Sequence, residues 1–411
     1  MDAATNRVVT DLAEHLATKA GHEVEVLCGG AGRRAPFHLP EENATEHNQV
    51  RIHRIGDLHW PRWRITGWNH PVNVLRYIIL ATLRVLWRRN HYDFVVTLDY
   101  PMLIRIGPHL AQLLTRQRPR HICWILDMTT EWRFLLGEWS HSDALHRFIH
   151  FLNTFPEKHA HLNVVPGRCM AERLLRRGVP AARIRHIPIW HYGDLIRPMP
   201  LGNSHPALEG LRGKWIVLYS GFAGKLHAFE AIKAAMVELR DHPRIHFVFA
   251  GDYPIIKDIE SWASARELPN FTRIDQVPFS ELNLLLAGAD SHLVTLRNET
   301  WGVCVPSKLY GCMASGRPVI FVGSSRSQCA RDIERAGAGY VVSDSEPARL
   351  AHVLQHLADH PSEAVAMGRN ARLYFEHHND VPVCLAKWEG IFKAPRRSLS
   401  TPADNCSPDL P

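Results

Sequence analysis

The stretch Val305–Ile320, VPSKLYGCMASGRPVI, joins a lysine-bearing loop, a helix and a buried strand within sixteen residues. Pro306 can begin a helix without losing a needed N–H, and Ser307 can cap one. Amides left free at a helix start can receive phosphate oxygens, and Lys308 adds a positive charge there. The run that follows, PVIF from Pro318, predicts a core strand. The stretch therefore predicts an α/β unit with an anion-binding loop, although similar units also occur without a phosphate ligand.

The same stretch resembles a segment of the retaining glycosyltransferases of family 4 (group 1), which usually reads PxKxxEYMAxGxPV; Gly311 stands at its acidic position. HLATKAGHEVEVLC (15–28) resembles that family's LAxxLxxxGHEVxVLT, GVPAARIRHIPIW (178–190) resembles GVPxxKIxVIPNW, and AGDYPIIKDIE (250–260) sits where the family has GxGPxxxxLE. The closest likeness is to the branch that builds bacterial surface polysaccharides, including fucosamine-type transferases, where PSKLYG and YSGNxGR recur. The resemblance implies the α/β fold called GT-B, in which two Rossmann-like doubly wound domains face each other across a cleft.

Composition is that of a globular protein. The chain has 411 residues, of which 45% are hydrophobic and 22% charged, so it is long enough for two domains with separate cores. Its eight cysteines are scattered without a CxxC pair, which favours a reducing compartment and no structural metal. The first thirty residues hold no apolar signal-peptide core, so we expect a cytoplasmic protein. The net charge of +7 predicts attraction to anions without choosing among them.

Hydrophobic patterns predict two series of alternating strands and helices, and hence two parallel sheets covered on both faces. A helix over Val8–Leu16 opens the first series. The strands expected in it are His22–Leu27, Arg51–Ile55, Phe94–Leu98, His121–Leu126 and Leu162–Val165. Those expected in the second are Trp215–Ser220, Ile245–Ala250, Phe271–Ile274, Ser291–Leu296, Val319–Val322 and Gly339–Val342.

These patterns divide the chain into five parts. We predict an N-terminal, acceptor-side domain over residues 1–190 and a nucleotide-sugar-binding domain over 207–375. The proline-rich residues 191–206 are the predicted linker. A C-terminal helix over 376–394 and a disordered tail over 395–411 complete the chain.

The resemblance also implies that the first strand of the N-terminal domain is missing from this sequence. Family members usually begin with a strand and a Gly-rich loop before the first helix, and Met1–Thr5 resembles only the end of that loop. Either the start codon is placed too far downstream or the protein lacks the strand. In the second case we expect an exposed sheet edge and fewer loop amides near the donor.

Ser220–Lys225, SGFAGK, follows a predicted strand and precedes a helix expected from about His227. Gly221 and Gly224 let backbone amides turn towards an anion, and Lys225 supplies positive charge. Because Leu226 follows the lysine, the loop is not a Walker A motif. The segment could also be a βα turn with a solvated lysine. The resemblance implies that Lys225 and Lys308 hold a donor diphosphate, with Ser307 and Leu309 beside them.

Glu299 follows the predicted strand Ser291–Leu296, at the sheet edge where open α/β sheets bind ligands. By the resemblance it contacts the transferred sugar, as the first acid of an ExxxxxxxE pair, and Gly311 replaces the second acid, which normally holds the ribose. Ribose recognition must then differ, or come from backbone groups or Glu299. As an alternative, Glu299 is an ordinary exposed loop acid.

Asp127 and Glu131 lie where the predicted strand His121–Leu126 runs into a polar turn, in a segment that resembles the DxxPE of the same branch. The resemblance makes both candidates for orienting the acceptor or transferring a proton, and Asp99 is a third. Each could instead cap a helix. The twenty-seven histidines form no sharp pattern, and His227 is either a donor contact or a surface histidine.

A basic aromatic stretch, His59–Trp68, leads into the apolar run Val72–Arg89. Arg76 and Arg84 interrupt that run, which argues against a membrane span. Tryptophan and arginine beside an apolar helix suit an anionic membrane interface, and a lipid-linked acceptor would place the protein there, on the inner face of the cell membrane. A core-packed helix with an exposed basic edge explains the pattern equally well.

The resemblance thus implies a retaining, metal-independent glycosyltransferase of hexosyl or N-acetylhexosaminyl type. It would move a sugar from a nucleoside diphosphate to an acceptor in surface-polysaccharide or glycolipid biosynthesis. The donor is a substrate, and we expect no cofactor and no nucleic-acid partner. Two alternatives are a nucleotide-sugar epimerase of the same fold and a degenerate, non-catalytic partner in a membrane-bound complex, which Gly311 and the missing strand would favour.

Overall fold

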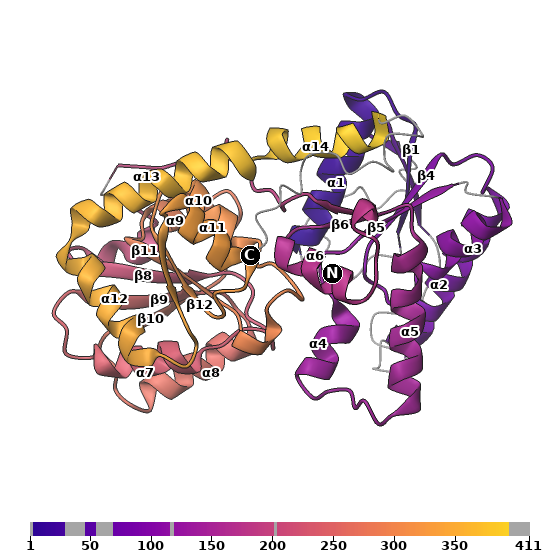
Figure 1. Cartoon of the computed structure of the whole chain (residues 1–411). Helices are drawn as coiled ribbons and strands as arrows, with labels where there is room; N and C mark the ends of the chain where they lie inside the picture. The colour runs from indigo at the N-terminus through magenta and orange to yellow at the C-terminus, as the bar shows by residue number, and fades with distance from the viewer. Residues whose placement is uncertain (1–2, 29–45, 55–68, 116–118, 201–203, 394–411) are drawn as a thin grey trace. The chain divides into compact units, whose positions relative to one another are not determined.

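The computed structural model describes residues 3–28, 46–54, 69–115, 119–200 and 204–393. The chain forms two compact units (Figure 1). Unit 1 comprises residues 1–166, 170–187 and 385–411, and unit 2 comprises residues 167–169 and 188–384. Each unit is an α/β structure built on parallel strands, so the α/β prediction is confirmed for both.

Unit 2 holds a six-stranded, wholly parallel sheet with the order β10-β9-β8-β11-β12-β13. Long runs of buried, mostly β-branched or aromatic side chains form its central strands, as expected for a parallel sheet covered on both faces. The strands are β8 (Trp215–Ser220), β9 (Ile245–Ala250), β10 (Phe271–Ile274), β11 (Ser291–Thr295), β12 (Val319–Val322) and β13 (Gly339–Val342). Five have the predicted bounds, and β11 ends one residue earlier.

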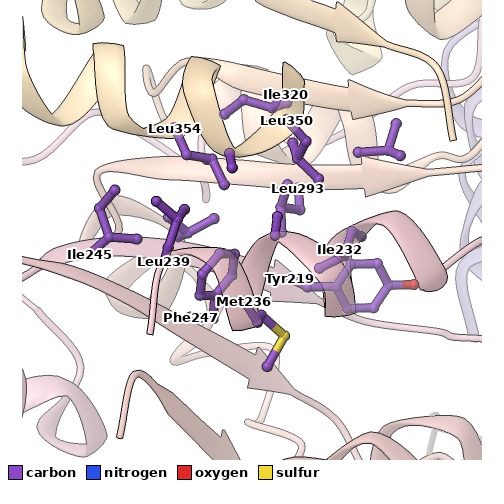
Figure 2. Close-up of a cluster of buried hydrophobic side chains, with 14 of the residues drawn as sticks. Tyr219, Ile232, Met236, Leu239, Ile245, Phe247, Leu293, Ile320, Leu350 and Leu354 are labelled. Carbon is purple, nitrogen blue, oxygen red and sulfur yellow. The ribbon is translucent and has the colours of Figure 1, made fainter. Parts of the chain in front are cut away.

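Helices cover both faces of this sheet. α7 packs on α12, and their apolar side chains meet those of β8, β9 and β11 in the core cluster shown in Figure 2. α10 packs on β11 and β12, and α11 packs on β12 and β13. The helices of unit 2 are α7 (Glu230–Glu238), α8 (Pro254–Ser264), α9 (Leu282–Ala287), α10 (Lys308–Ala314), α11 (Gln328–Ala336), α12 (Pro347–Asp359) and α13 (Pro361–His378).

The described residues of unit 1 form two sheets, where the sequence predicted one. The first has the order β1-β3-β2, with β2 antiparallel to β3, and the second is the parallel sheet β4-β5-β6-β7. Among the described residues, β1 and β4 each pair on one side only, and no strand precedes α1. The strands are β1 (Val24–Cys28), β2 (Glu46–His47), β3 (Val50–Arg54), β4 (Phe94–Thr97), β5 (Arg120–Trp124), β6 (Leu162–Val165) and β7 (Ile184–His186).

Helices accompany these sheets, and none of the helices that the structure describes is long and apolar enough to cross a membrane. They are α1 (Ala3–Thr18), α2 (Asn69–Trp87), α3 (Ile106–Leu114), α4 (Thr129–Leu135), α5 (Ala144–His159) and α6 (Arg168–Arg176). The basic aromatic stretch His59–Trp68 lies outside the described residues, as do the last residue of the predicted C-terminal helix and the tail 395–411 for which disorder was predicted.

The predicted linker 191–206 belongs to unit 2, because its described residues pack on that unit. Arg372 of α13 donates to the carbonyl oxygens of Gly193 and Ile196 at 3.2 and 2.7 Å, and the Gly193 amide donates to Asp380 at 3.0 Å. The described part of this segment is therefore bound to unit 2 and is not a free connection.

The C-terminal helix α14 (Val381–Lys393) begins in unit 2 and ends in unit 1. Within unit 1, the fully buried Trp388 lies edge-on to Trp124 of β5, with ring centroids 4.7 Å apart. Phe392 contacts Phe94 of β4 at 5.0 Å, and Glu389 pairs with His15 of α1 at 3.2 Å. The second half of α14 is thus part of the core of unit 1.

We predict that Trp388→Ala destabilises unit 1 by about 3–5 kcal/mol, because it leaves a large cavity beside β5. Hydrogen exchange should speed up at residues 120–124 and stay unchanged at residues 245–250 in unit 2. Lys387→Ala, which alters the exposed neighbour, is the control. Equal exchange at 120–124 in wild type and Trp388→Ala would contradict this packing role.

Candidate functional site

The strand order of unit 2 reverses between β8 and β11. From β8 the chain builds β9 and β10 on one side, and it then returns to place β11, β12 and β13 on the other. Ligands of open α/β sheets bind at such a reversal, outside the carboxyl ends of the strands. The loops that follow β8 and β11 both emerge there. They carry Gly221, Gly224, Lys225, Glu299 and Ser307 of the predicted donor site, and Lys308 and Leu309 open α10 directly after the second loop.

Hydrogen bonds join these two loops. The Thr295 hydroxyl, at the end of β11, donates to the Ala228 carbonyl at 2.7 Å, and the Arg297 amide donates to the Leu226 carbonyl at 2.8 Å. The Arg297 Nε also donates to the Lys225 carbonyl at 2.9 Å. These bonds hold residues 225–228 in a non-helical loop that includes a turn at residues 225 and 226, and α7 begins at Glu230. The prediction of a helix from about His227 was wrong for this reason.

Lys308 points its ammonium group back into the β8 loop. Its Nζ donates to the Tyr219 hydroxyl and to the Phe222 carbonyl, both at 2.6 Å. Burial lowers the pKa of Lys308 to about 7. The side chain is therefore a cation whose charge is only weakly maintained near neutral pH, and a nearby anion would stabilise the charged form.

Tyr219 is the residue that positions this lysine. Its ring is fully buried in the core cluster, and Figure 2 shows its hydroxyl at the margin of that cluster. The hydroxyl donates to the Phe222 carbonyl at 2.8 Å while it accepts from Lys308. Sequence reasoning missed this role. The YSG run was noticed, but nothing in it indicates that the tyrosine hydroxyl reaches residue 308.

The glycines of the β8 loop have distinct roles. Gly221 has φ +98°, which favours glycine, and a Cβ at Gly224 would lie 2.6 Å from the Phe222 ring. The Gly224 amide donates to Nδ1 of His227 at 3.1 Å. Burial, followed by the charge of Lys308, lowers the pKa of His227 to about 3, so its ring is neutral at physiological pH. His227 therefore stabilises the loop instead of lying free on the surface.

Ser307 precedes α10 but does not cap it. Its backbone is already helical, with φ −61° and ψ −24°, and its side chain accepts no bond from the helix amides. The Leu309 amide bonds to the Pro306 carbonyl at 3.2 Å instead, so a tight turn opens the helix. The predicted capping role of Ser307 was wrong. Its half-buried hydroxyl stands beside Lys308, and Leu309 is fully buried.

Glu299 is exposed in a short 3-10 helix (Asn298–Thr300) after β11, and its carboxylate is 3.9 Å from the Arg297 guanidinium. The neighbouring Asn298 anchors the turn, because its amide donates to Asp344 at 2.9 Å and its side chain to Ser343 at 2.8 Å. The turn is thus held at the sheet edge while the Glu299 side chain faces solvent.

Gly311 lies in the buried first turns of α10, against His191. A Cβ at position 311 would be 3.0 Å from Nε2 of the His191 ring. That ring lies in turn next to Tyr192, with centroids 5.6 Å apart. An acidic side chain at 311 would therefore require His191 to move, which gives a physical reason for glycine in this chain.

In unit 1, the predicted acids lie at the carboxyl ends of β4 and β5 but differ in surroundings. Asp127 is exposed after β5, and the N-cap of α4 is Met128, which makes no side-chain cap. Asp99 is buried after β4, and its carboxylate accepts from the Leu126 amide at 3.0 Å. Burial raises the pKa of Asp99. Asp99 therefore braces the loop that presents Asp127.

Glu131 belongs to a network of ion pairs. Its carboxylate lies 3.4 Å from Arg173 and 3.3 Å from Arg177, and Arg177 also pairs with the buried Glu157 at 2.7 Å. Arg105 completes the network, 2.7 Å from Glu157. These contacts give Glu131 a structural role in joining α4 to α6.

A metal site is not evident in the part of the chain that the structure describes. No group of three or more histidine, cysteine, aspartate or glutamate side chains there has the arrangement of metal ligands. The positive groups near the reversal of the unit 2 sheet are instead lysines and arginines.

Two protein families match consecutive parts of the chain. Residues 4–190 match the glycosyl transferase 4-like domain, and residues 214–360 match the glycosyl transferases group 1. Together they cover most of the sequence and coincide with the two series of strands.

Two curated proteins are similar to parts of the chain. The probable glycosyltransferase WbjE of Pseudomonas aeruginosa is 27% identical over 216 residues, which are 52% of this chain and 54% of WbjE. The putative colanic acid biosynthesis glycosyl transferase WcaI of Escherichia coli K12 is 26% identical over 169 residues, 39% of this chain and 40% of WcaI. The chain thus spans about half the length of these relatives or less.

Among solved structures, HepE of Anabaena, determined in complex with UDP-glucose, has the same fold. It superposes with a TM-score of 0.69 at 12% identity, over 95% of this chain and 96% of HepE. The fold of this chain is therefore GT-B, with two Rossmann-like domains, as predicted.

We predict that Lys308 titrates several pH units below a solvated lysine, because the folded protein buries its ammonium group. Labelling of lysine amines by a small acylating reagent at a series of pH values, read by mass spectrometry, should give a midpoint of about 7 for Lys308. Tyr219→Phe removes an acceptor of the ammonium and should move that midpoint lower. The exposed Lys214 is the internal control, and a shared midpoint would contradict the prediction.

Proposed function

Taking as premise that this chain carries a glycosyl transferase 4-like domain followed by a glycosyl transferases group 1 domain, we propose that it is a retaining glycosyltransferase. It transfers a hexosyl or N-acetylhexosaminyl group from a nucleoside diphosphate to an acceptor in surface-polysaccharide or glycolipid biosynthesis. WbjE and WcaI carry names that point to the same kind of transfer, and WcaI is named for colanic acid. HepE was solved with UDP-glucose, a donor of the proposed class.

The observation that carries the proposal is the cation at the reversal of the unit 2 sheet. Lys308 is held there by Tyr219 and the Phe222 carbonyl, and the exposed Lys225 lies in the same loop as Phe222. A diphosphate placed outside the carboxyl ends of β8 and β11 would meet both lysines and the amides of a glycine-rich turn. Binding would also restore full charge to Lys308, since an anion raises the pKa of a neighbouring ammonium.

The chemistry follows from these charges. The bond between the sugar C1 and the diphosphate oxygen breaks, and a bond from the acceptor oxygen to C1 forms on the same face. The acceptor proton passes to the leaving phosphate. Negative charge grows on the diphosphate, and Lys225 and Lys308 stabilise it more strongly in the transition state than in the ground state. No metal ion is assigned a role.

The acids have separate roles in this proposal. Glu299 accepts hydrogen bonds from hydroxyls of the transferred sugar, since its exposed carboxylate extends from the turn after β11. Asp127 orients the acceptor from the carboxyl end of β5. With His191 filling the space beside Gly311, the ribose is recognised by backbone groups or by Glu299 rather than by an acid at position 311.

We predict that Lys308→Ala and Lys225→Ala each lower kcat/KM by about 10²–10³-fold, as expected for the loss of one group that stabilises transition-state charge. Transfer should be measured with UDP-, GDP- and dTDP-sugars, and donor binding by calorimetry, with NAD as a negative control. Lys214→Ala removes an exposed lysine at the opposite end of β8 and should leave both unchanged. Wild-type turnover in either site variant would refute the assigned roles.

We also predict that kcat/KM falls as pH rises through about 7. The direction follows from the positive charge of Lys308, which is lost as pH rises. Because burial lowers the pKa of Lys308, this loss occurs near neutral pH in the free enzyme, and kcat/KM reports the pKa values of the free enzyme. The corresponding decline in kcat should lie at higher pH, because the bound diphosphate stabilises the ammonium. Tyr219→Phe should shift the kcat/KM profile to lower pH. A profile that stays flat across neutral and mildly alkaline pH would contradict the role of Lys308.

A further inference from the structure

Helices α2, α3 and α5 form one continuous layer of unit 1 (Figure 1). α3 packs on both neighbours. Its approach to α2 is close, because a Cβ at Gly107 would lie 2.7 Å from the Thr82 hydroxyl. On the other side, the His109 ring lies 5.4 Å from the ring of Phe155, and the Leu103 amide donates to Asn153 of α5 at 3.1 Å.

The outer side of this layer is apolar. On α2 the exposed residues recur every four positions and on α5 every three or four, so each set lines one side of its helix. Their exposed fractions run from 37% to 80%, and soluble monomers rarely leave so many large apolar side chains together in water. We call this set the apolar helix face: Leu75, Ile79, Leu83, Trp87, Leu110, Leu113, Leu114, Leu145, Phe148, Phe151 and Phe155.

The charges around the apolar helix face are almost all positive. Across α2, α3 and α5 the only acid is Glu157, which is buried and paired with Arg105 and Arg177. Asp143 lies just before α5 and caps its first amides. The exposed arginine and lysine side chains of these helices are Arg76 on α2 and Arg147 and Lys158 on α5.

Helical geometry places these bases beside the apolar residues. At about 100° per residue, Arg76 projects between Leu83 and Trp87 on α2. By the same spacing, Arg147 and Lys158 lie together along one edge of the apolar stripe of α5, next to Phe151. Leucine, phenylalanine and tryptophan side chains mixed with arginine and lysine are the composition of surfaces that lie in a membrane interface.

We propose that the apolar helix face docks on an anionic lipid bilayer, with its leucine and aromatic side chains at the level of the acyl chains. Arg76, Arg147 and Lys158 would bind the negative headgroups. A second copy of the chain is a poorer occupant, because a symmetric contact would set these bases against one another without an acid to offset them. The inference rests on unit 1 alone and stands apart from the proposed sugar transfer.

The test uses the full-length protein and sedimentation with vesicles. Binding is expected to vesicles that contain phosphatidylglycerol, to weaken as salt is added, and to be much weaker on pure phosphatidylcholine. Leu83→Asp and Phe151→Asp should each weaken binding by about tenfold or more, since each removes the burial of one large apolar side chain. Leu373→Asp is the matched control: Leu373 is 54% exposed on α13 of unit 2, against 56% for Leu83 and 53% for Phe151.

Charge variants test the contribution of the bases separately from that of the apolar side chains. Arg76→Glu and Arg147→Glu should weaken binding to the anionic vesicles and remove most of its salt dependence, whereas Arg212→Glu, an exposed site in unit 2, should not. In the wild-type protein, anionic vesicles should slow hydrogen exchange at residues 75–87, 106–114 and 145–155 and leave residues 371–378 unchanged. That measurement requires no substitution and so does not depend on the folding of a variant.

Three results would overturn the proposal. The first is no sedimentation with phosphatidylglycerol vesicles, and the second is binding that Leu83→Asp and Leu373→Asp reduce equally. The third is concentration-dependent self-association without lipid that Leu83→Asp abolishes, which would assign the apolar helix face to a contact between copies. Lys308→Ala should lose donor binding and keep vesicle binding. This result would show that the membrane inference and the proposed sugar transfer can be tested separately.

Discussion

Parallel pairing of β8 with β11 is the constraint on which the candidate donor site depends. The two strands share only the register pairs Ser291 with Val217 and His292 with Leu218, and the Asp290 carboxylate extends the contact by accepting from the Ile216 amide at 2.7 Å. This pairing sets side by side two loops that are about seventy residues apart in the chain. The hydrogen bonds of Thr295 and Arg297 and the contact of Lys308 with Tyr219 all require it.

The site is also tied to the core of unit 2 through Tyr219. One face of this residue contributes to packing with Phe229 and Phe249, whose ring centroids lie 5.1 and 5.4 Å from its own, and its hydroxyl sets the position of Lys308. Burial that stabilises the sheet thus also weakens the positive charge of the lysine. Packing and electrostatics cannot be optimised independently at this residue.

Much of unit 2 could be predicted from the sequence, because its strands are continuous runs of buried side chains ended by glycine, proline or polar residues. Unit 1 was harder. Its β1 strand is half-buried, and the three-residue β7 and the two-residue β2 are too short to show a pattern. The split into two sheets depends on which strands pair, which hydrophobic periodicity does not encode.

In the candidate site, too, local sequence patterns were informative and contacts between distant residues were not predicted. The glycines, Lys225 and Glu299 could be singled out because they follow strand ends, and Lys308 because it begins a helix, where local pattern is informative. Tyr219, His191 and the ion pairs of Glu131 were missed because their roles come from contacts between distant residues, such as Tyr219 with Lys308. The failed predictions for Ser307 and for the start of α7 have different causes. Ser307 does not cap α10 because its own backbone is already helical, whereas residues before α7 are bonded by the loop after β11.

Unit 1 is discontinuous in the sequence, and this has a consequence for recombination between relatives. The chain passes between the units after residues 166, 169, 187 and 384, and the final passage brings Trp388 and Phe392 to β5 and β4. A chimera that exchanged everything after residue 190 would carry a foreign helix into the core of unit 1. Exchange of unit 1 between such proteins therefore requires all three of its segments. The last part of α14 must be exchanged together with the strands that it covers.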